Sequence, residues 1–356
     1  MPSRDDVLLK VRLQARGVRL EAAREQRAGG AGPTDGVTLF FGGLVATVPT
    51  VAPFVSSSPF ELVDTGTGRE MLLRDGEPCR EVEVAGPPAF YSLETGGGVP
   101  FRKIALRHGR DAIGSTVAQY CMRAGDACRF CGIAVSRQSG STVTLKEPGD
   151  LAEVGRAALE EGYRHAVLTT GTTDPGDCGI PHLEKCAAAL KEATGGAMSV
   201  HVQFEPPADM SRIDRVARVS DSAAINIECF DPAALSRVAP GKAAAGVARY
   251  ESAWRRAVSA FGAGQVCCFI LAGLGEDPGS VARGAERLCE MGVYPFLLPF
   301  RPTAGTPMVA AAPPAEEMMV ELYETVAGLV DASGMSAGDC LAGCVRCGAC
   351  SAITDW

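Results

Sequence analysis

Short apolar stretches alternate with amphipathic stretches along the chain after residue 104. The apolar stretches have the length of buried strands, and the amphipathic stretches have the periodicity of helices. The pattern predicts strands over 116–121, 165–170, 198–204, 223–227, 266–271 and 293–299. It predicts helices over 148–163, 181–194, 209–219, 246–261, 279–291 and 315–332.

An alternation of strands and helices with short connections implies a parallel sheet with right-handed crossovers. The periodicity alone does not exclude a doubly wound sheet. Candidate functional residues repeatedly follow the strand ends, however, and parallel barrels carry their chemistry on that face. We therefore expect an α/β fold with a (β/α) barrel, either a partial six-stranded barrel or a full TIM-type barrel.

The chain before residue 106 has a different pattern. Residues 1–36 predict a short amphipathic helix followed by a Gly-rich arm at 28–33. Apolar stretches on both sides of Gly42-Gly43, and again around Asp75-Gly76, predict two β-hairpins. We expect a small β-rich module over 37–105, a barrel over 106–312, and a C-terminal helix with a cysteine-rich segment over 313–356.

Composition and charge narrow the class of protein. With 46% hydrophobic and 21% charged residues, the chain is not globally disordered. The formal charge of −8 argues against a nucleic-acid partner, which would favour a basic excess. No apolar run is long enough to span a bilayer, and residues 1–27 do not have the pattern of a secretory signal. We expect a cytoplasmic protein with no membrane partner.

The chain has 14 cysteines, and seven of them fall into two clusters. Several others lie within apolar runs, where a thiol acts as a small hydrophobe. They are Cys186, Cys229, Cys267, Cys268 and Cys289. A reducing compartment disfavours disulfides, so metal ligation is the better explanation for the clusters.

The first cluster comprises Cys121, Cys128 and Cys131, a C-x6-C-x2-C spacing directly after the first predicted strand of the repeat. Three thiolates on one loop can ligate three irons of a cubane and leave the fourth iron open to a small molecule. A structural zinc site requires four protein ligands, and no histidine or fourth cysteine lies nearby in the sequence.

The second cluster comprises Cys344, Cys347 and Cys350, with Cys340 four residues before the first of them. The C-x2-C-x2-C spacing repeats part of the ferredoxin motif, which favours a second iron–sulfur cluster. Zinc and free thiols are the alternatives.

The first cysteine loop, with Phe130 directly before its third cysteine, resembles that of the radical S-adenosylmethionine (SAM) superfamily. The usual spacing there is C-x3-C-x2-C, so this loop is three residues longer. More narrowly, the chain is similar to a biotin-synthase-related radical SAM family often encoded beside nitrilases. That family has a C-terminal cysteine motif, which covers Cys344, Cys347 and Cys350 but not Cys340. The matching stretches are 27–33, 169–172, 203–207, 240–242, 270–275, 299–307 and 343–350.

The resemblance implies a radical SAM barrel in which the first trio holds a [4Fe–4S] cluster whose open iron chelates SAM. It implies contacts to SAM from the turn Thr170-Gly171-Thr172, from the fifth-strand residue Gly273, and from polar residues that end the third and fourth strands. Those polar residues are Glu205, Asn226 and Glu228. They are expected to bind either SAM or the substrate. A simple turn at 170–172 and capping or solvated polar side chains are the structural alternatives. Tyr120, Arg218, Lys242 and Arg301 are further candidates for substrate or carboxylate contacts.

The function implied by the resemblance is reductive cleavage of SAM to a 5′-deoxyadenosyl radical that abstracts hydrogen from a small-molecule substrate. An auxiliary [4Fe–4S] cluster at the C-terminal cysteines would act as sulfur donor in a biosynthetic sulfur insertion, with flavodoxin or ferredoxin as electron donor. The alternative is a radical rearrangement or bond cleavage in which the auxiliary cluster binds substrate or relays electrons. Alternatives of other classes are an iron–sulfur electron carrier or sensor and a zinc-bound scaffold.

Overall fold

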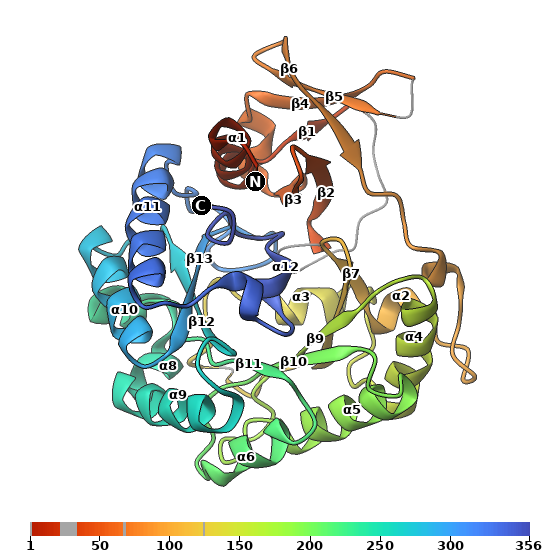
Figure 1. Cartoon of the computed structure of the whole chain (residues 1–356), viewed down its shortest axis with the longest axis vertical. Coiled ribbons are helices and arrows are strands. Elements are labelled where there is room, and N and C mark those ends of the chain that lie inside the picture. The colour runs from red at the N-terminus through yellow and green to blue at the C-terminus, as the bar shows by residue number, and fades with distance from the viewer. Residues whose placement is uncertain (1, 22–33, 67–68, 124) are drawn as a thin grey trace.

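The structure is a computed structural model, and it describes residues 2–21, 34–66, 69–123 and 125–356. It contains two sheets, a larger one built from the chain after residue 105 and a smaller one built from the chain before residue 85 (Figure 1). The expected Gly-rich arm at 28–33 falls outside the described residues.

The larger sheet has seven strands in the order β13-β12-β11-β10-β9-β8-β7. All neighbouring pairs from β8 to β13 are parallel, and β7 is antiparallel to β8. Because the order follows the chain without reversal, the sheet is not doubly wound. In the described part of the chain, β13 does not pair with β7, so the sheet curls but stays open. The strands are β7 (Leu106–His108), β8 (Ala112–Ala118), β9 (His165–Thr170), β10 (Ser199–Gln203), β11 (Ser222–Ala224), β12 (Val266–Ala272) and β13 (Val293–Pro299).

Helices form an outer ring around this sheet (Figure 1). One or more helices follow each parallel strand, as the alternating pattern predicted, and three follow β11 in succession. The apolar residues of the helices pack toward the strands. The helices are α4 (Pro148–Glu160), α5 (Ile180–Ala193), α6 (Ser211–Ala217), α7 (Pro232–Val238), α8 (Pro240–Ala245), α9 (Val247–Phe261), α10 (Pro278–Glu290) and α11 (Glu316–Ala332). The short α3 (Ile133–Gln138) follows the first cysteine loop.

The structure differs from the expectations from the sequence in three respects. The first strand of the repeat was expected over 116–121, whereas β8 ends at Ala118 and begins earlier, at Ala112. Because Gly114 and Ser115 are poor strand formers, the sequence pattern did not indicate that the strand begins at Ala112. Helices α7 and α8 were not expected, because each is too short to show a helical period. Of the two barrel types expected, the described residues do not form the full TIM-type barrel. Their six parallel strands make an open sheet.

The smaller sheet has the order β1-β4-β5-β6-β2-β3. Both expected hairpins are confirmed: β2 (Gly36–Phe41) pairs with β3 (Leu44–Pro49), and β5 (Glu70–Arg74) pairs with β6 (Glu77–Val84), each antiparallel. The strands β1 (Arg19–Leu20) and β4 (Phe60–Asp64) complete it. The expected N-terminal helix is α1 (Arg4–Arg16), which packs against β3 and α11. The short α2 (Phe101–Ile104) leads into β7.

The C-terminal segment links the two sheets. After α11 it passes the amino ends of β11 and β12, where Ser222 Oγ donates to Ala342 O at 3.0 Å and Gln265 Nε2 donates to Asp339 O at 2.8 Å. It then forms α12 (Cys344–Cys347), which lies on the inner side of the curled sheet (Figure 1). The division of the chain at residues 36, 105 and 312 stays a prediction.

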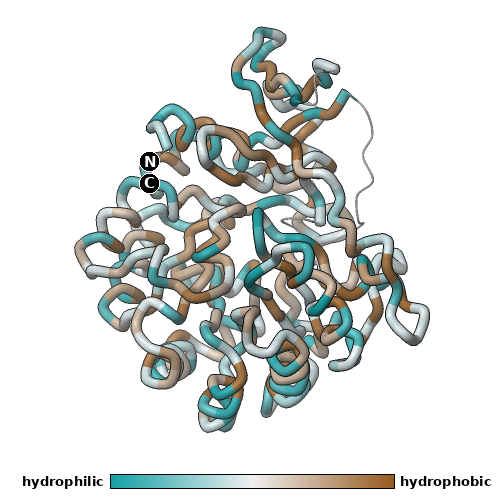
Figure 2. Tube along the Cα trace, turned by 45° about the vertical axis from the view of Figure 1, so that its right-hand side comes forward, coloured by the Kyte–Doolittle hydropathy of each residue, from teal (hydrophilic) through white to brown (hydrophobic). Residues whose placement is uncertain are grey.

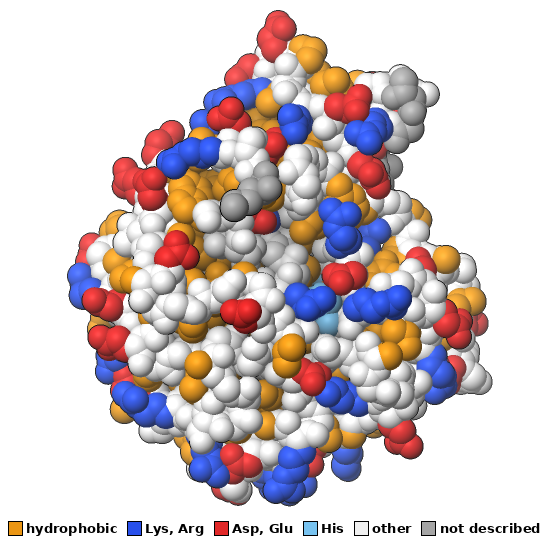
Figure 3. Space-filling view, viewed as in Figure 1, with side chains coloured by type: hydrophobic (Ala, Val, Ile, Leu, Met, Phe, Trp, Pro, Cys, Tyr) orange, Lys and Arg blue, Asp and Glu red, His pale blue; other side chains and the backbone are white. Residues whose placement is uncertain are grey.

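One continuous hydrophobic core includes residues from α1, from both sheets and from the C-terminal segment. In Figure 2, many hydrophobic segments run through the interior of the molecule, and many of the outer turns are hydrophilic. Charged side chains of both signs are scattered over the face in Figure 3. In the described residues, none of the helices combines the length and apolar character needed to cross a membrane.

A substitution of Trp254, on α9, tests the packing between the helices and the larger sheet. Its side chain is fully buried, and its indole Nε1 donates to Ile225 O at 2.8 Å. Trp254→Ala leaves a large cavity and an unpaired carbonyl, so we expect a loss of about 3–5 kcal/mol of unfolding free energy in denaturant titrations. Arg255→Ala, at an exposed position on the same helix, should change the unfolding free energy by less than about 0.5 kcal/mol. Equal effects of the two substitutions would contradict this account.

Candidate active site

The first cysteine loop lies at the carboxyl ends of the parallel strands. It follows β8 and is held by the turn after β9, where Met122 N donates to Thr172 O at 2.9 Å. It is also held by the first turn of α8, where Gly241 N donates to Asp126 O at 3.1 Å. The expected position of the cysteines after the first parallel strand is therefore found.

The three thiols of this loop lie near one another. Cys131 lies close enough to Cys121 and to Cys128 for their charges to interact. Burial raises the pKa of the Cys128 thiol to about 12, and the nearby Lys242 ammonium lowers it. A metal must therefore displace the proton of Cys128 when it binds.

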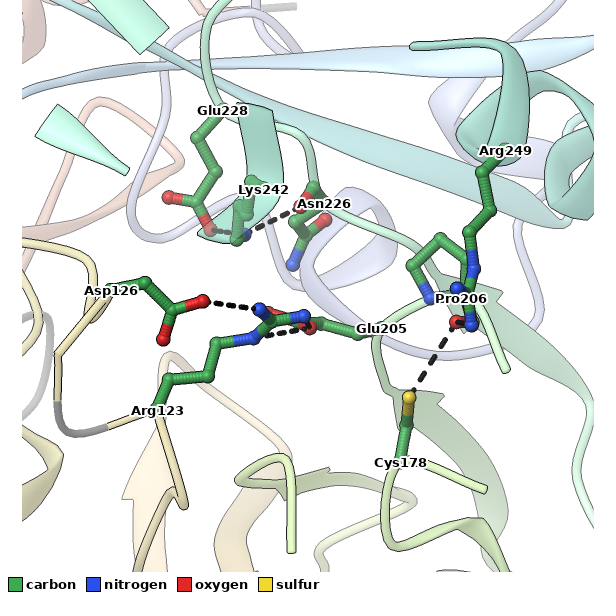
Figure 4. A network of polar contacts seen from close by, with 9 residues as sticks. All are labelled: Arg123, Asp126, Cys178, Glu205, Pro206, Asn226, Glu228, Lys242 and Arg249. Atoms are coloured by element: carbon green, nitrogen blue, oxygen red, sulfur yellow. Dashed lines mark hydrogen bonds and ion pairs between the residues drawn. The ribbon is translucent and has the colours of Figure 1, made fainter. Parts of the chain in front are cut away.

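Charged residues of the loop contact the end of β10. Arg123 donates to Glu205 Oε2 through Nε at 3.1 Å and Nη2 at 2.9 Å (Figure 4). Its Nη1 donates to Asp126 Oδ2 at 2.9 Å. Glu205, a predicted site residue, thus faces the cysteine loop, and its Oε2 accepts both hydrogen bonds from Arg123.

A second charged pair lies beside the first (Figure 4). Lys242 Nζ donates to Glu228 Oε1 at 3.0 Å and to Asn226 O at 2.6 Å. Burial lowers the pKa of Lys242, but the Glu228 carboxylate has the opposite effect and the pKa is raised well above its usual value. Glu228 has φ of 75°, a strained conformation for a side chain of this size, and such strain concentrates at functional sites.

The remaining predicted contacts are distributed around the same edge of the sheet. Thr170 ends β9, and the buried Thr172 holds the cysteine loop by its carbonyl. Asn226 Oδ1 accepts from Phe269 N at 3.0 Å, which leaves its side-chain amide group as the donor for a ligand. Gly273 follows β12, and its N–H donates to Glu276 Oε1 at 2.8 Å. Among the described residues, no hydrogen bond or ion pair joins Gly273 to the cysteine loop.

The other candidates from the sequence lie apart from one another. Lys242 is in the network of Figure 4. Arg301 is buried and donates from Nη2 to Thr47 O at 2.8 Å, so it contacts the smaller sheet. Arg218 is exposed at the end of α6. Tyr120 is half-buried, and its carbonyl lies against Gly171.

The C-terminal cysteines gather on the inner side of the sheet. Cys344 lies close enough to Cys350 and to Cys347 for their charges to interact. Gln203, the last residue of β10, donates from Nε2 to Cys344 Sγ at 3.6 Å. Gly109, in the turn between β7 and β8, faces Cys347 so closely that an added Cβ would lie 2.6 Å from its Sγ. These three cysteines therefore form a compact group between β10 and the β7–β8 turn.

Cys340 lies close enough to Cys344 for their charges to interact, but its thiol is hydrogen-bonded to the backbone. Its Sγ donates to Ala342 O at 3.1 Å, near the amino end of β11. Cys267, expected to be a structural thiol, is buried on β12 and lies near both Cys344 and Cys340. The role of Cys340 as a ligand stays a prediction.

Both trios fit a cubane cluster better than a preformed site for one ion. In the parts of the chain that the structure describes, no three or more His, Cys, Asp or Glu side chains converge on a single ion position. Each thiolate of a cubane binds a different iron, so its sulfurs stand further apart than ligands of one ion. Each trio brings three thiols together, the number that a cubane with one open iron needs.

Three of the four histidines lie together near the C-terminal cysteines. His165 interacts electrostatically with His108 and with His201, and burial lowers the pKa of His108 to about 4 and that of His201 to about 3. His165 Nδ1 accepts from Gly343 N at 3.3 Å. Burial therefore keeps His108 and His201 neutral. His182 lies elsewhere and donates from Nε2 to Lys146 O at 3.0 Å.

Two surface cavities add to this picture. One of about 420 Å³ includes Cys347, Arg110, Arg346, Asp111 and Asp355 in its walls, so it opens beside the C-terminal group. A larger one of about 950 Å³ lies between β2, β6 and the loops before β7. None of the predicted site residues lines the larger cavity, and we assign it no role.

Sequence reasoning missed Arg123, Asp126, Gln203 and Gly109. The charges of Arg123 and Asp126 within the unusually long cysteine spacing were an available signal. The contacts of Gln203 and Gly109 depend on the tertiary fold and leave no local pattern.

Comparison with known proteins gives one sequence relative and several related folds. No family model matches the chain. The bacteriochlorophyllide c C-7(1)-hydroxylase of Chlorobaculum limnaeum is 25% identical over 350 residues, which cover 92% of this chain and 85% of the hydroxylase.

Among solved structures, HydG, a maturase of the [FeFe]-hydrogenase, has a TM-score of 0.50 and 18% identity over 64% of this chain and 50% of HydG. A radical SAM methyltransferase from Sphaerobacter thermophilus has a TM-score of 0.47 and 17% identity, covering 78% of this chain and 75% of its own. The chain thus has a mixed α/β fold with a curled half-barrel sheet, and this fold is similar to that of HydG.

Gly171 tests whether the turn after β9 positions the cysteine loop. A Cβ at this residue would lie 1.9 Å from the backbone oxygen of Tyr120, directly before Cys121. Gly171→Ala must therefore displace the loop, and we expect roughly half of the iron to be lost after anaerobic reconstitution, if each trio holds one cluster. Gly125→Ala is the matched control, because a Cβ there meets nothing within 4 Å. Full iron in Gly171→Ala would contradict the role of this turn.

Proposed function

We propose that the chain is a radical SAM enzyme that acts on a small-molecule substrate. The observation that carries the proposal is the cysteine trio Cys121, Cys128 and Cys131 at the carboxyl ends of an open parallel sheet, surrounded by polar side chains. The resemblance of the cysteine loop to that of the radical SAM superfamily supports it, and the fold is similar to that of HydG. When bound, a [4Fe–4S] cluster and SAM would supply a 5′-deoxyadenosyl radical by one-electron cleavage of the sulfonium.

The residues around the trio have distinct roles in this proposal. Thr170, Gly171 and Thr172 line the loop and offer backbone groups to the amino group of SAM. Glu205, Asn226 and Glu228 bind its amino group or ribose hydroxyls, and Gly273 packs beside the adenine. Lys242 holds Glu228 in place, and Arg123 holds Glu205 until SAM competes for its carboxylate. Burial of these groups strengthens each charged contact.

We also propose a second [4Fe–4S] cluster at Cys344, Cys347 and Cys350, with Cys340 as a candidate fourth ligand. Under the sulfur-insertion hypothesis, this auxiliary cluster is the sulfur donor, by analogy with biotin synthase. Flavodoxin or ferredoxin is the proposed electron donor, and the cytoplasm the proposed location.

The hydroxylase relative favours a second candidate reaction. Its name states hydroxylation at a carbon atom, and it aligns with 92% of this chain. In this alternative the substrate carbon gains oxygen instead of sulfur, and the auxiliary cluster binds substrate or relays an electron.

Iron analysis and SAM cleavage test the proposed class. Anaerobically reconstituted protein should hold about eight irons per chain and form 5′-deoxyadenosine with SAM and dithionite. Replacing Cys121, Cys128 and Cys131 by Ala should leave about four irons and abolish 5′-deoxyadenosine. Replacing Cys344, Cys347 and Cys350 should also leave about four irons but keep the cleavage.

Cys79→Ala, at an exposed cysteine of β6 outside both trios, is the control and should change neither measurement. Zinc in place of iron would favour a scaffold. Iron without SAM cleavage would favour an electron carrier or sensor. Cleavage that survives loss of the first trio would overturn the assignment.

The fate of labelled atoms distinguishes the two reactions. Protein reconstituted with labelled sulfide and incubated with the small-molecule fraction of a cell extract, SAM and dithionite should place label in a product. About one turnover per chain is expected, because a donor cluster is consumed. Labelled oxygen from water in the product, with the sulfide label retained by the protein, would instead establish hydroxylation.

A further inference from the structure

The N-terminal helix α1 carries two polar residues on its buried face. The side chains of Lys10 and Gln14, one helical turn apart, are 0% and 1% exposed. A buried ammonium is costly unless its hydrogen bonds and charge are satisfied, so its position indicates a specific role.

Both side chains reach the segment between the last two C-terminal cysteines. Lys10 Nζ donates to Gly348 O at 2.8 Å, and Gln14 Nε2 donates to Ala349 O at 2.9 Å. Thr47 N, on β3, donates to the same Ala349 carbonyl at 2.6 Å. Three donors from the N-terminal part of the chain therefore fix two successive carbonyls between Cys347 and Cys350.

The larger sheet holds the same segment from the other side. Gln203 contacts Cys344, and the bare face of Gly109 contacts Cys347. The cysteine segment is thus held between two parts of the chain. On one side α1 and β3 bind the backbone between Cys347 and Cys350, and on the other side the larger sheet contacts Cys344 and Cys347.

Lys10 also contributes charge. Its ammonium lies near enough to Cys347 for their charges to interact, and Asp355 Oδ2 accepts from it at 2.6 Å. An iron–sulfur cluster becomes more negative on reduction, and nearby charge is one of the factors that set its potential. A buried cation beside the cluster would favour its reduced form, the paired Asp355 carboxylate offsets part of this effect, and the neutral Gln14 has none.

We propose that α1 forms part of the C-terminal metal centre, with Lys10 and Gln14 holding the cysteine segment in its ligating conformation and Lys10 raising the reduction potential of the cluster. This inference rests on the second cluster of the proposed function. It gives α1 and β3 a role in positioning the C-terminal cysteines.

Four single variants separate the two roles. Lys10→Met removes the donor and the charge, Lys10→Gln keeps a donor but removes the charge, and Gln14→Leu removes a donor only. Arg12→Gln is the matched control, since Arg12 lies on the same helix but is partly exposed and pairs with Glu316. Iron and sulfide per chain and the cluster potentials, from redox titrations followed by electron paramagnetic resonance, are the readouts.

Lys10→Met and Gln14→Leu should each lose up to half of the iron and keep SAM cleavage by the first cluster. In Lys10→Gln, the C-terminal cluster that remains should have a more negative potential, whereas Gln14→Leu should leave the potential of its remaining cluster unchanged. Arg12→Gln should match the wild type in both readouts. Circular dichroism of each variant checks that the chain folds, and if Lys10→Met does not fold, the other two variants decide.

Full iron and wild-type potentials in all three variants would overturn the inference. The triple replacement of Cys344, Cys347 and Cys350 distinguishes this failure from failure of the second cluster itself. If that triple variant loses no iron, the C-terminal cluster is wrong. If it loses half while the Lys10 and Gln14 variants lose none, only the role of α1 is wrong.

Discussion

A parallel sheet that curls without closing leaves its inner face uncovered, and this constraint determines much of the molecule. In a closed small barrel, side chains from opposite strands fill the interior. Here the inner face carries His165, His201 and Cys267, which would be left exposed to solvent by the missing strands. The C-terminal segment covers them, and its backbone satisfies polar groups at the amino ends of β9 and β11.

Covering the inner face in this way brings the two ends of the chain together. Lys10 and Gly348 are separated by 338 positions, yet they form a buried hydrogen bond. Thr47 on the smaller sheet donates to the C-terminal segment and accepts from Arg301 after β13. The smaller sheet, the last strand of the larger sheet and the C-terminal segment therefore stabilise one another, and their hydrophobic residues belong to one core.

The sequence predicted the parts of this structure that depend on local periodicity. The strand 165–170 and the strand 293–299 match β9 and β13 at both ends, because their apolar runs end at turn residues. The position of the first cysteine loop followed from the strand before it. The meeting of Lys10 with Gly348, or of Gln203 with Cys344, could not be predicted, because such contacts depend on how the whole chain folds. A lysine on the apolar face of an amphipathic helix was the one local sign of the first contact.

The long spacing of the first cysteine loop has a structural explanation in the contacts of Arg123 and Asp126. Lengthening a loop costs little, about 0.6 kcal/mol for a doubling of its length. In return, residues between Cys121 and Cys128 form charge-assisted hydrogen bonds with Glu205 and a backbone bond with Gly241. Glu205 follows Gln203 by two positions along the β10 strand direction, and Gln203 contacts the C-terminal cysteines. One strand end thus holds the loop of the first trio and touches the second, so a displacement of β10 acts on both groups of cysteines at once.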